Sequence, residues 1–449
     1  MPRADALFPP GFVWGASTSA YQVEGAVRED GRGVSVWDTF SHTPGKIANG
    51  DTGDVACDHY RRWPEDLGLM RELGLGAYRF SVAWPRILPD GRGKPNEAGL
   101  DHYRRLIDAL RAAGIEPWPT LHHWDLPQAL QDAGGWRSRD TARRFGEYAH
   151  VVARALGGGV HHWATINEPL ILTLFGHYLG WHAPGLRGMP NALAAGHHVM
   201  LAHAEGLEAL RGEMAAGDQA GIVLNLTDVH PLTDSNADLE AAELADVYAN
   251  RSFLDPLFKG RYPDDILRRF DGQLPEIAPD DMARISRPID FLGVNYYTRL
   301  VARHAPGAEP LGVVPAQPPG VPVTAAGWEV YPDGLRHLLT RLHRDYAPAA
   351  LYVLENGAAY DDTVVDGQVD DPLRERYLHE HLLACLGAIE EGAPLKGYFV
   401  WSLLDNFEWA EGYRRRFGVV HVDFATQRRT IKRSGLWYAS VTRENGLPG

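Results

Sequence analysis

Short apolar runs, rich in β-branched and aromatic residues, recur eight times along the chain, and residues with helical spacing follow most of them. Turn or helix-start residues bound each run, a pattern that predicts a buried strand. Strand and helix are therefore expected to alternate. The eight runs are residues 12–20, 77–84, 116–124, 161–168, 220–226, 291–298, 351–356 and 397–404.

The segment after the second run shows the helical spacing most clearly. Tyr103, Leu106, Ile107 and Leu110 stand at positions i, i+3, i+4 and i+7, which places them on one face of a helix. Gly114 follows where a helix C-cap is expected. Comparable stripes run through residues 145–156 and 377–385.

Alternating strands and helices favour one fold class. Parallel strands joined by helices must bury both faces of their sheet, and eight such units can close into a barrel that leaves no edge. The sequence therefore predicts an α/β protein in which residues 1–449 form a single (β/α)8 TIM barrel, with loop insertions at the C-terminal face of the strands. The chain lacks the GxGxxG, GxSxG and Walker A motifs of competing α/β folds. The longest irregular stretch, residues 303–327, carries six prolines and is expected to be a loop that is either functional or disordered.

Composition and charge exclude several classes of protein. The apolar fraction of 45% excludes disorder, and no uninterrupted apolar run reaches the roughly 18 residues of a membrane span. A net charge of −14 disfavours nucleic acid as a partner. No signal peptide is apparent, so we expect a cytoplasmic protein. Cys57 and Cys385 lie outside any CxxC pattern and are expected to be buried free thiols, and the sequence carries no signal for an oligomeric state.

Two of the predicted strands end in a glutamate. The fourth ends with Glu168 before Pro169, and the seventh with Glu355 before Asn356 and Gly357. The C-terminal ends of barrel strands converge on one mouth, so both carboxylates should project into it. One carboxyl group can protonate a leaving oxygen while the other stabilises or attacks an oxocarbenium carbon. The pair therefore indicates hydrolysis of a sugar acetal.

Other strand ends carry side chains suited to a polyol ring. Amide, imidazole and carboxyl groups can bond sugar hydroxyls, and indole faces can stack on a pyranose. These side chains are Gln22, His122, His123, Trp124, Asp125, Asn295, Tyr296, Tyr297, Trp401, Asn406, Glu408 and Trp409.

Ten ordered sequence blocks between Phe8 and Phe424 resemble glycoside hydrolase family 1, the β-glucosidase and β-galactosidase family. Ten blocks in one order are highly specific, whereas TINEP or ENG alone would be weak. The blocks are FPPGFVWGASTSAYQVEGA, GVSVWDTF, YRFSVAWPRI, TLHHWDLPQAL, TINEP, NYY, GWEVYPDGL, ENG, WSLLDNFEWAEGY and GVVHVDF.

The resemblance implies a retaining double displacement, with Glu168 as acid/base and Glu355 as nucleophile. In such enzymes the two carboxyl groups lie about 5–5.5 Å apart. Arg79 matches the arginine beside the nucleophile, whose positive charge keeps Glu355 ionised. Repulsion from Glu355 should in turn keep a proton on Glu168.

Further roles are implied by the same resemblance. Asn167 would bond the sugar 2-hydroxyl, Tyr297 would orient Glu355, and Trp328 would support the leaving group. An anionic Glu408 would disfavour 6-phosphoglycosides by repulsion. The ring hydroxyls would contact Gln22, His123, Asn295, Trp401 and Glu408, and Trp409 would close over the non-reducing end.

The expected activity is exo-hydrolysis of terminal β-D-glucosyl residues from small β-glycosides or β-linked oligosaccharides, with galactosides and fucosides as further substrates. No cofactor, metal, nucleic acid or membrane is expected. Three alternatives stay open: transglycosylation, specialisation on one aglycone, and a catalytically silent sugar-binding protein. Two positions depart from the family pattern. Leu354 stands where threonine is frequent, and His122 stands where tyrosine is frequent.

Overall fold

A closed barrel of parallel strands forms the centre of the computed structural model, which describes residues 6–448. The strands follow one another around the barrel in the order β1-β13-β10-β7-β5-β4-β3-β2. The predicted TIM barrel is thereby confirmed, and each of the eight expected runs supplies one strand. The strands are β1 (Val13–Ser17), β2 (Ala77–Ser81), β3 (Glu116–His122), β4 (His162–Asn167), β5 (Gln219–Asn225), β7 (Phe291–Asn295), β10 (Leu351–Asn356) and β13 (Leu395–Trp401).

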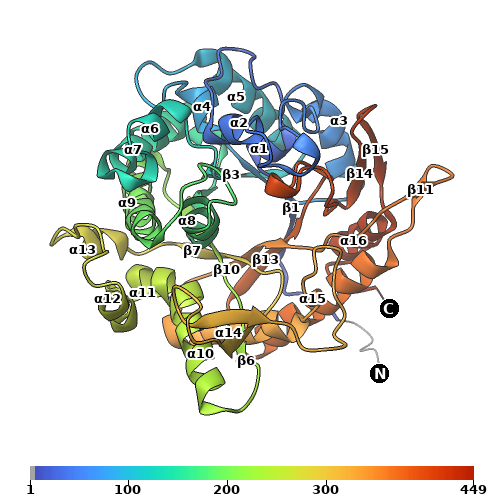
Figure 1. Cartoon of the computed structure of the whole chain (residues 1–449). Coiled ribbons are helices and arrows are strands. Elements are labelled where there is room, and N and C mark those ends of the chain that lie inside the picture. Colours follow the sequence, from blue (N-terminus) through green and yellow to red (C-terminus); the bar gives the residue numbers. More distant parts are fainter. Residues whose placement is uncertain (1–5, 449) are drawn as a thin grey trace.

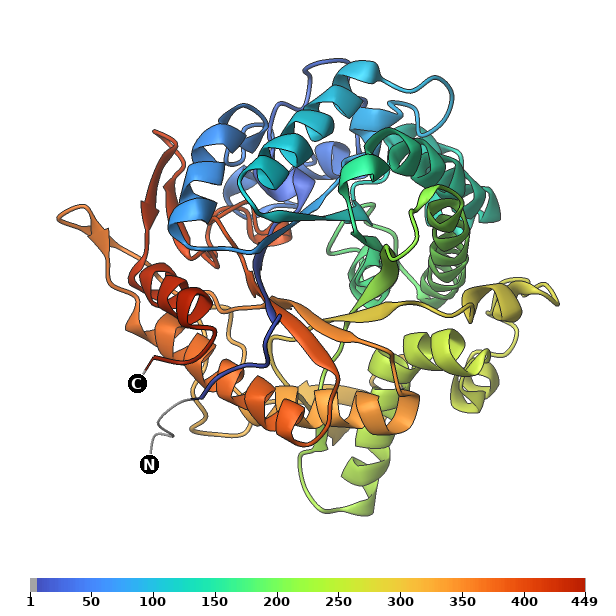
Figure 2. The ribbon, with the colours of Figure 1, turned by 180° about the vertical axis from the view of Figure 1, so that it is seen from behind.

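Helices surround the strands, as Figure 1 and the reverse view in Figure 2 show. At least one helix follows every barrel strand along the chain. The longer helices are α3 (His59–Glu72), α5 (Glu97–Ala112), α7 (Arg139–Leu156), α9 (Met189–Glu213), α10 (Asn236–Asp246), α11 (Ser252–Lys259), α14 (Pro332–Tyr346), α15 (Pro372–Glu390) and α16 (Arg433–Glu444). Shorter helices are α1 (Ala20–Val23), α2 (Val36–Ser41), α4 (Trp84–Ile87), α6 (Gln128–Asp132), α8 (Pro169–Thr173), α12 (Asp264–Arg269) and α13 (Asp281–Ile285).

Two apolar layers hold the barrel together. The inner layer fills the barrel with residues that come almost entirely from the strands, including Trp118, Phe291 and Phe399. The outer layer lies between strands and helices and contains the stripe predicted for α5, all of which is buried. Burying each large side chain contributes about 1.5–3 kcal/mol. Gly114 follows α5 with φ 73°, the conformation expected after a helix end.

Residues 303–327 differ from the predicted irregular loop. Strand β9 (Val313–Ala316) pairs antiparallel with β8 (Leu300–His304), and β6 (Val229–Pro231) completes this small sheet. Pro315 lies within β9, which is possible because β9 is an edge strand and an edge proline need not donate to a neighbour. The prolines had favoured a loop, but pairing with β8 outweighs that preference.

Two short hairpins lie nearer the C-terminus. They are formed by β11 (Val364–Val365) with β12 (Gln368–Val369), and by β14 (Val420–Asp423) with β15 (Arg428–Ile431). Among residues 6–448, no helix is both long and apolar enough to cross a membrane.

A buried ionic cluster fixes the segment that follows β13. Lys432 is fully buried, and its ammonium group lies 2.7 Å from Asp405 and 2.5 Å from Asp362. Arg374 is also fully buried and bonds Asp362 at 2.7 Å. Asp405 precedes Asn406, which bonds Gln22 at the barrel mouth. The cluster therefore holds one side of the mouth in place.

Replacing Lys432 by methionine should lower the free energy of unfolding by about 3–5 kcal/mol, because two buried carboxylates lose their shared cation. The matched control is Arg268→Met, which breaks a largely exposed pair with Asp265 and should change stability by no more than about 0.5 kcal/mol. Urea-unfolding midpoints at pH 7 measure the difference. Equal midpoints for the two variants would contradict the assigned role of the cluster.

Candidate active site

The end of β4 turns its last residues into the barrel mouth. Between the Ala164 and Asn167 pairs, β4 advances three residues while β5 advances two, and such a register shift re-aims the side chains that follow. Glu168 comes next with φ 49° and ψ 66°. This left-handed conformation costs about 1–3 kcal/mol for a residue other than glycine. Pro169 then begins α8, as proline often does at a first helical position.

The end of β10 also contains a register shift. Between the Val353 and Glu355 pairs, β10 advances two residues while β7 advances one. Two positions later, a Cβ atom on Gly357 would lie 1.7 Å from the carbonyl oxygen of Trp401. Only glycine fits there, which gives the ENG motif a steric reason. The backbones that carry Glu355 and Trp401 therefore approach each other closely.

The Arg79 side chain joins the strand ends beneath the mouth. Its Nη1 donates to Glu355 Oε1 at 2.6 Å, its Nη2 to Asn167 Oδ1 at 2.7 Å, and its Nε to Thr120 Oγ1 at 3.0 Å. The Tyr297 hydroxyl donates to the other oxygen of Glu355 at 2.6 Å. Both oxygens of Glu355 thus accept a short hydrogen bond. This arrangement favours an ionised carboxylate held in one orientation.

Glu168 has a different environment. Its Oε1 accepts hydrogen bonds from Asn295 at 2.7 Å and from Asn225 at 3.2 Å. Burial and the negative charge of Glu355 raise the pKa of Glu168 to about 8, although the two amide hydrogen bonds and the Arg79 charge act in the opposite direction. Near neutral pH Glu168 therefore holds a proton, and Glu355 is the partner suited to carry the negative charge.

Glu408 is a third carboxyl group in the same site. The Gln22 amide donates to it at 3.3 Å and to Asn406 at 3.0 Å. Burial, together with the charges of Glu355 and Glu168, raises the pKa of Glu408 to about 8. At neutral pH Glu408 is therefore largely protonated. The expected repulsion of 6-phosphoglycosides by an anionic Glu408 should therefore strengthen as the pH rises through about 8.

Aromatic rings form the walls of the site. The His123 ring lies nearly parallel to Trp401 and Trp409, with centroids 6.1 and 5.9 Å away. Trp409 has φ 48°, a second left-handed conformation at this mouth. Trp328 packs against Tyr297 at 5.4 Å and is 37% exposed. Its exposed face is thus available to a ligand beside the hydroxyl that bonds Glu355.

These groups surround a cavity of about 1050 Å³. Twelve residues were given a catalytic, supporting or sugar-binding role by the family resemblance or as polar strand ends. Eight of them line the cavity, and they are Glu168, Glu355, His123, Tyr297, Trp328, Trp401, Glu408 and Trp409; Trp124, another predicted strand-end residue, also lines it. The other four lie beneath the lining and bond to it, and they are Gln22, Asn167, Asn295 and Arg79.

Sequence reasoning missed several residues of the site. Asn225, at the end of β5, bonds Glu168 and could have been found as a further polar strand end. The outer part of the cavity is lined by apolar residues of α8 and the π-helical turn after it, including Leu170, Leu174 and Phe175. Their i, i+4 spacing directly after the TINEP block was the available signal. Together they give the entrance an apolar wall.

The two departures from the family pattern lie away from the cavity lining. The Leu354 side chain packs inside the barrel, and its carbonyl oxygen accepts from the Ser17 hydroxyl at 2.6 Å. His122 packs against Trp84 and Trp136, outside the barrel. Burial lowers the pKa of His122 to about 3, so its ring is neutral. Both residues therefore act through packing.

Comparison with known proteins identifies the family. The model of glycosyl hydrolase family 1 matches residues 4–447. The chain belongs to this family. It is 47% identical over 442 residues to beta-glucosidase A of Thermotoga maritima, with 98% of each chain covered. It is 45% identical to a bifunctional beta-D-glucosidase/beta-D-fucosidase of Bifidobacterium breve, covering 96% of this chain and 97% of that one.

A solved structure gives the same result for this family 1 chain. The beta-glucosidase of Thermotoga maritima in complex with deoxynojirimycin superposes with a TM-score of 0.97 at 46% identity, and the match covers 99% of this chain and 100% of that one. The resemblance inferred from the ten sequence blocks is therefore confirmed.

Removing the Asn225 amide should raise the pKa of Glu168, because the lost hydrogen bond favoured its charged form. The family resemblance implies that Glu168 acts as an acid when protonated, so kcat/KM should fall as pH rises through about 8 in the wild type and at higher pH in Asn225→Ala. Thr227→Ala alters the same wall without touching Glu168 and serves as the control. An Asn225→Ala profile that is unchanged, or moved to lower pH, would contradict this assignment.

Proposed function

We propose that this chain is a retaining exo-β-glucosidase in which Glu355 is the nucleophile and Glu168 the acid/base. The observation that carries the proposal is the contrast between two buried carboxyl groups in one cavity: Glu355 is paired with Arg79, and Glu168 has its pKa raised to about 8. Retention requires the two carboxyl groups to lie about 5–5.5 Å apart. Residues 1–449 are proposed to act as one catalytic domain.

In the first step, a Glu355 oxygen attacks the anomeric carbon while Glu168 gives its proton to the glycosidic oxygen. The bond to the leaving group breaks and a glucosyl ester of Glu355 forms. The Arg79 and Tyr297 hydrogen bonds hold Glu355 in position for this attack. Asn167, fixed by Arg79 and His123, is placed to bond the sugar 2-hydroxyl.

In the second step, the Glu168 carboxylate takes a proton from water, and the water oxygen attacks the anomeric carbon. The ester bond breaks, glucose leaves with its original configuration, and Glu355 regains its charge. Esterification removes that charge during the intermediate, so the pKa of Glu168 falls when a base is needed. The same residue therefore serves both steps.

The proposed glycone is glucose, with fucose and galactose as further substrates. Relatives named as β-glucosidases and as a β-glucosidase/β-fucosidase support this choice. The largely protonated Glu408 can donate a hydrogen bond to a sugar hydroxyl as well as accept one. Trp401 and His123 supply flat faces for the ring.

The proposed aglycone is apolar or a further glucose unit. Support comes from the cavity lining, which includes Trp328 and the apolar residues Leu170, Leu174 and Phe175. Cellobiose would be one such substrate and would link the enzyme to cellulose breakdown. Cytoplasmic localisation is also proposed, since Cys57 and Cys385 are both buried free thiols, as a reducing compartment permits.

Two alternatives are distinguished by product analysis. A transglycosylase would form new glycosides when acceptor sugars are added, whereas the proposed hydrolase would release mainly glucose. A silent sugar-binding protein would give no product at all. The presence of both Glu168 and Glu355 in the cavity favours an active enzyme over a silent one.

Replacing Glu355 by alanine should reduce turnover to background, because no other carboxylate can form the ester. Added azide should restore turnover on activated aryl β-glucosides and give the α-glucosyl azide, which NMR identifies by its anomeric coupling. Glu411→Ala, at the outer edge of the same cavity, is the control and should keep activity. Substantial activity of Glu355→Ala without azide would refute the assignment.

Replacing Glu168 by alanine should act mainly on the second step. Aryl glucosides with good leaving groups should still glycosylate the enzyme and release a burst of phenol, followed by turnover slowed about 10²–10⁴-fold. Cellobiose, whose leaving group needs a proton, should lose more. Stopped-flow and steady-state rates on both substrates measure the two effects. Equal losses on both substrates without a burst would argue against the acid/base role.

A further inference from the structure

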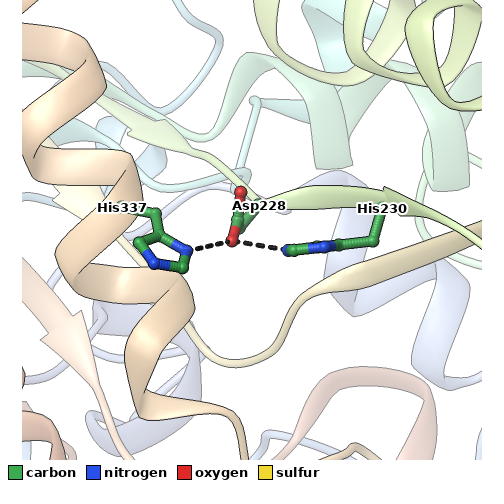
Figure 3. A group of neighbouring side chains, drawn as sticks. All are labelled: Asp228, His230 and His337. Carbon is green, nitrogen blue, oxygen red and sulfur yellow. Dashed lines mark hydrogen bonds and ion pairs between the residues drawn. The ribbon is translucent and has the colours of Figure 1, made fainter.

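Three potential metal ligands converge outside the sugar cavity. Asp228, in the loop after β5, accepts hydrogen bonds through Oδ2 from His230 at 2.7 Å and from His337 at 3.1 Å. Figure 3 shows the carboxylate lying between the two imidazole rings, one from β6 and the other from helix α14. One donor atom from each residue lies within 4.8 Å of both others. Residues 6–448 contain one such group of three.

The donor set points to one class of ion. Two imidazoles and a carboxylate suit zinc and neighbouring divalent transition metals, whereas Mg²⁺ and Ca²⁺ prefer oxygen ligands alone. In a tetrahedral zinc site with bonds of about 2.0–2.1 Å, neighbouring donor atoms lie roughly 3.3 Å apart. The observed 2.7 and 3.1 Å would need to lengthen by about 0.6 and 0.2 Å, and the two histidine nitrogens, which lie within 4.8 Å of each other, would need to reach the same spacing.

Solvent can reach the three ligands. The side chains of Asp228, His230 and His337 are 18%, 31% and 42% exposed. An ion can therefore enter directly, and water can occupy its remaining position. Partial burial also leaves the ligands pre-positioned: the Asp228 carbonyl accepts from the Leu300 amide at 2.9 Å, and the His230 ring packs edge-on against Tyr331 at 5.6 Å.

One neighbour opposes metal binding. Arg336 donates to His337 Nε2 at 3.2 Å, which leaves the proton of a neutral His337 on Nδ1, the atom that faces Asp228. Coordination through Nδ1 moves that proton to Nε2, so the Arg336 hydrogen bond must break. Arg336 bonds His337 through Nη2 and pairs with Glu391 through Nη1 at 2.5 Å. The pair with Glu391 does not involve His337, so it can persist when the bond to His337 breaks. Removing Arg336 should therefore strengthen binding.

We propose that Asp228, His230 and His337 bind one divalent transition-metal ion of the zinc class. None of the three ligands lines the sugar cavity, so the ion does not take part in glycoside hydrolysis. Instead it joins the loop after β5 to α14. That loop follows Asn225, which bonds Glu168, and α14 follows the segment that carries Trp328. The ion would thus fasten two parts of the cavity wall from outside, and this proposal does not depend on the proposed reaction.

Calorimetric titration of tag-free, metal-free protein with ZnCl₂ tests the site. The wild type should bind one equivalent, and His337→Ala and His230→Ala should each lose at least about 10-fold in affinity, since even indirect partners of metal ligands cost 10–100-fold. His343→Ala, an exposed histidine on the same helix, is the matched control and should bind like the wild type. Arg336→Met should bind more tightly than the wild type.

Anomalous scattering from a zinc-soaked crystal locates the ion independently of any variant. The proposal expects a peak among Asp228 Oδ2, His230 Nε2 and His337 Nδ1. It is overturned if the wild type binds no stoichiometric ion, if His337→Ala and His230→Ala bind as well as His343→Ala, or if the peak lies elsewhere.

Discussion

The hydrogen bonds made by Arg79 are the constraint on which the rest of the site depends. One guanidinium group reaches from β2 to the ends of β3, β4 and β10, where it bonds Thr120, Asn167 and Glu355. Because the group is planar and permanently charged, it fixes the positions of its partners and places a positive charge beside Glu355. Loss of Arg79 would leave Glu355 buried and unpaired, which is strongly unfavourable. Arg79 therefore both joins the strand ends at the barrel mouth and supplies the positive charge beside Glu355.

The three carboxyl groups of this site differ in their surroundings. Arg79 pairs with Glu355, and burial together with the charge of Glu355 raises the pKa values of Glu168 and Glu408 to about 8. The site thus places one negative charge beside the cation and keeps two neutral acids nearby. A glycosidase that forms an ester at Glu355 and then needs a base can use this imbalance, since esterification removes the charge that helped to hold the proton on Glu168.

The barrel and the two glutamates were predictable because both follow from local pattern. Apolar runs mark buried strands, and the ends of parallel strands converge, so the sequence alone indicates Glu168 and Glu355 as a pair at the barrel mouth. The register shifts that aim them inward were not predictable, because pairing between strands has no local signature. Strand β9 was not predicted because Pro315 and the five other prolines of residues 303–327 favoured a loop. Asp228 and His337 lie 109 positions apart, so no local sequence pattern indicated that their side chains are in contact.

The pKa of Glu168, measured before and after Glu355 is esterified, shows whether the charge of Glu355 helps to hold the proton on Glu168. Carbon-13 NMR of glutamate-labelled protein can follow the Glu168 carboxyl group, assigned by its loss in Glu168→Gln, in the free enzyme and in the stable 2-deoxy-2-fluoroglucosyl enzyme. We expect a pKa of about 8 in the free enzyme and a lower value once Glu355 carries the sugar, because esterification removes the neighbouring negative charge. The same pKa in both states would contradict this expectation.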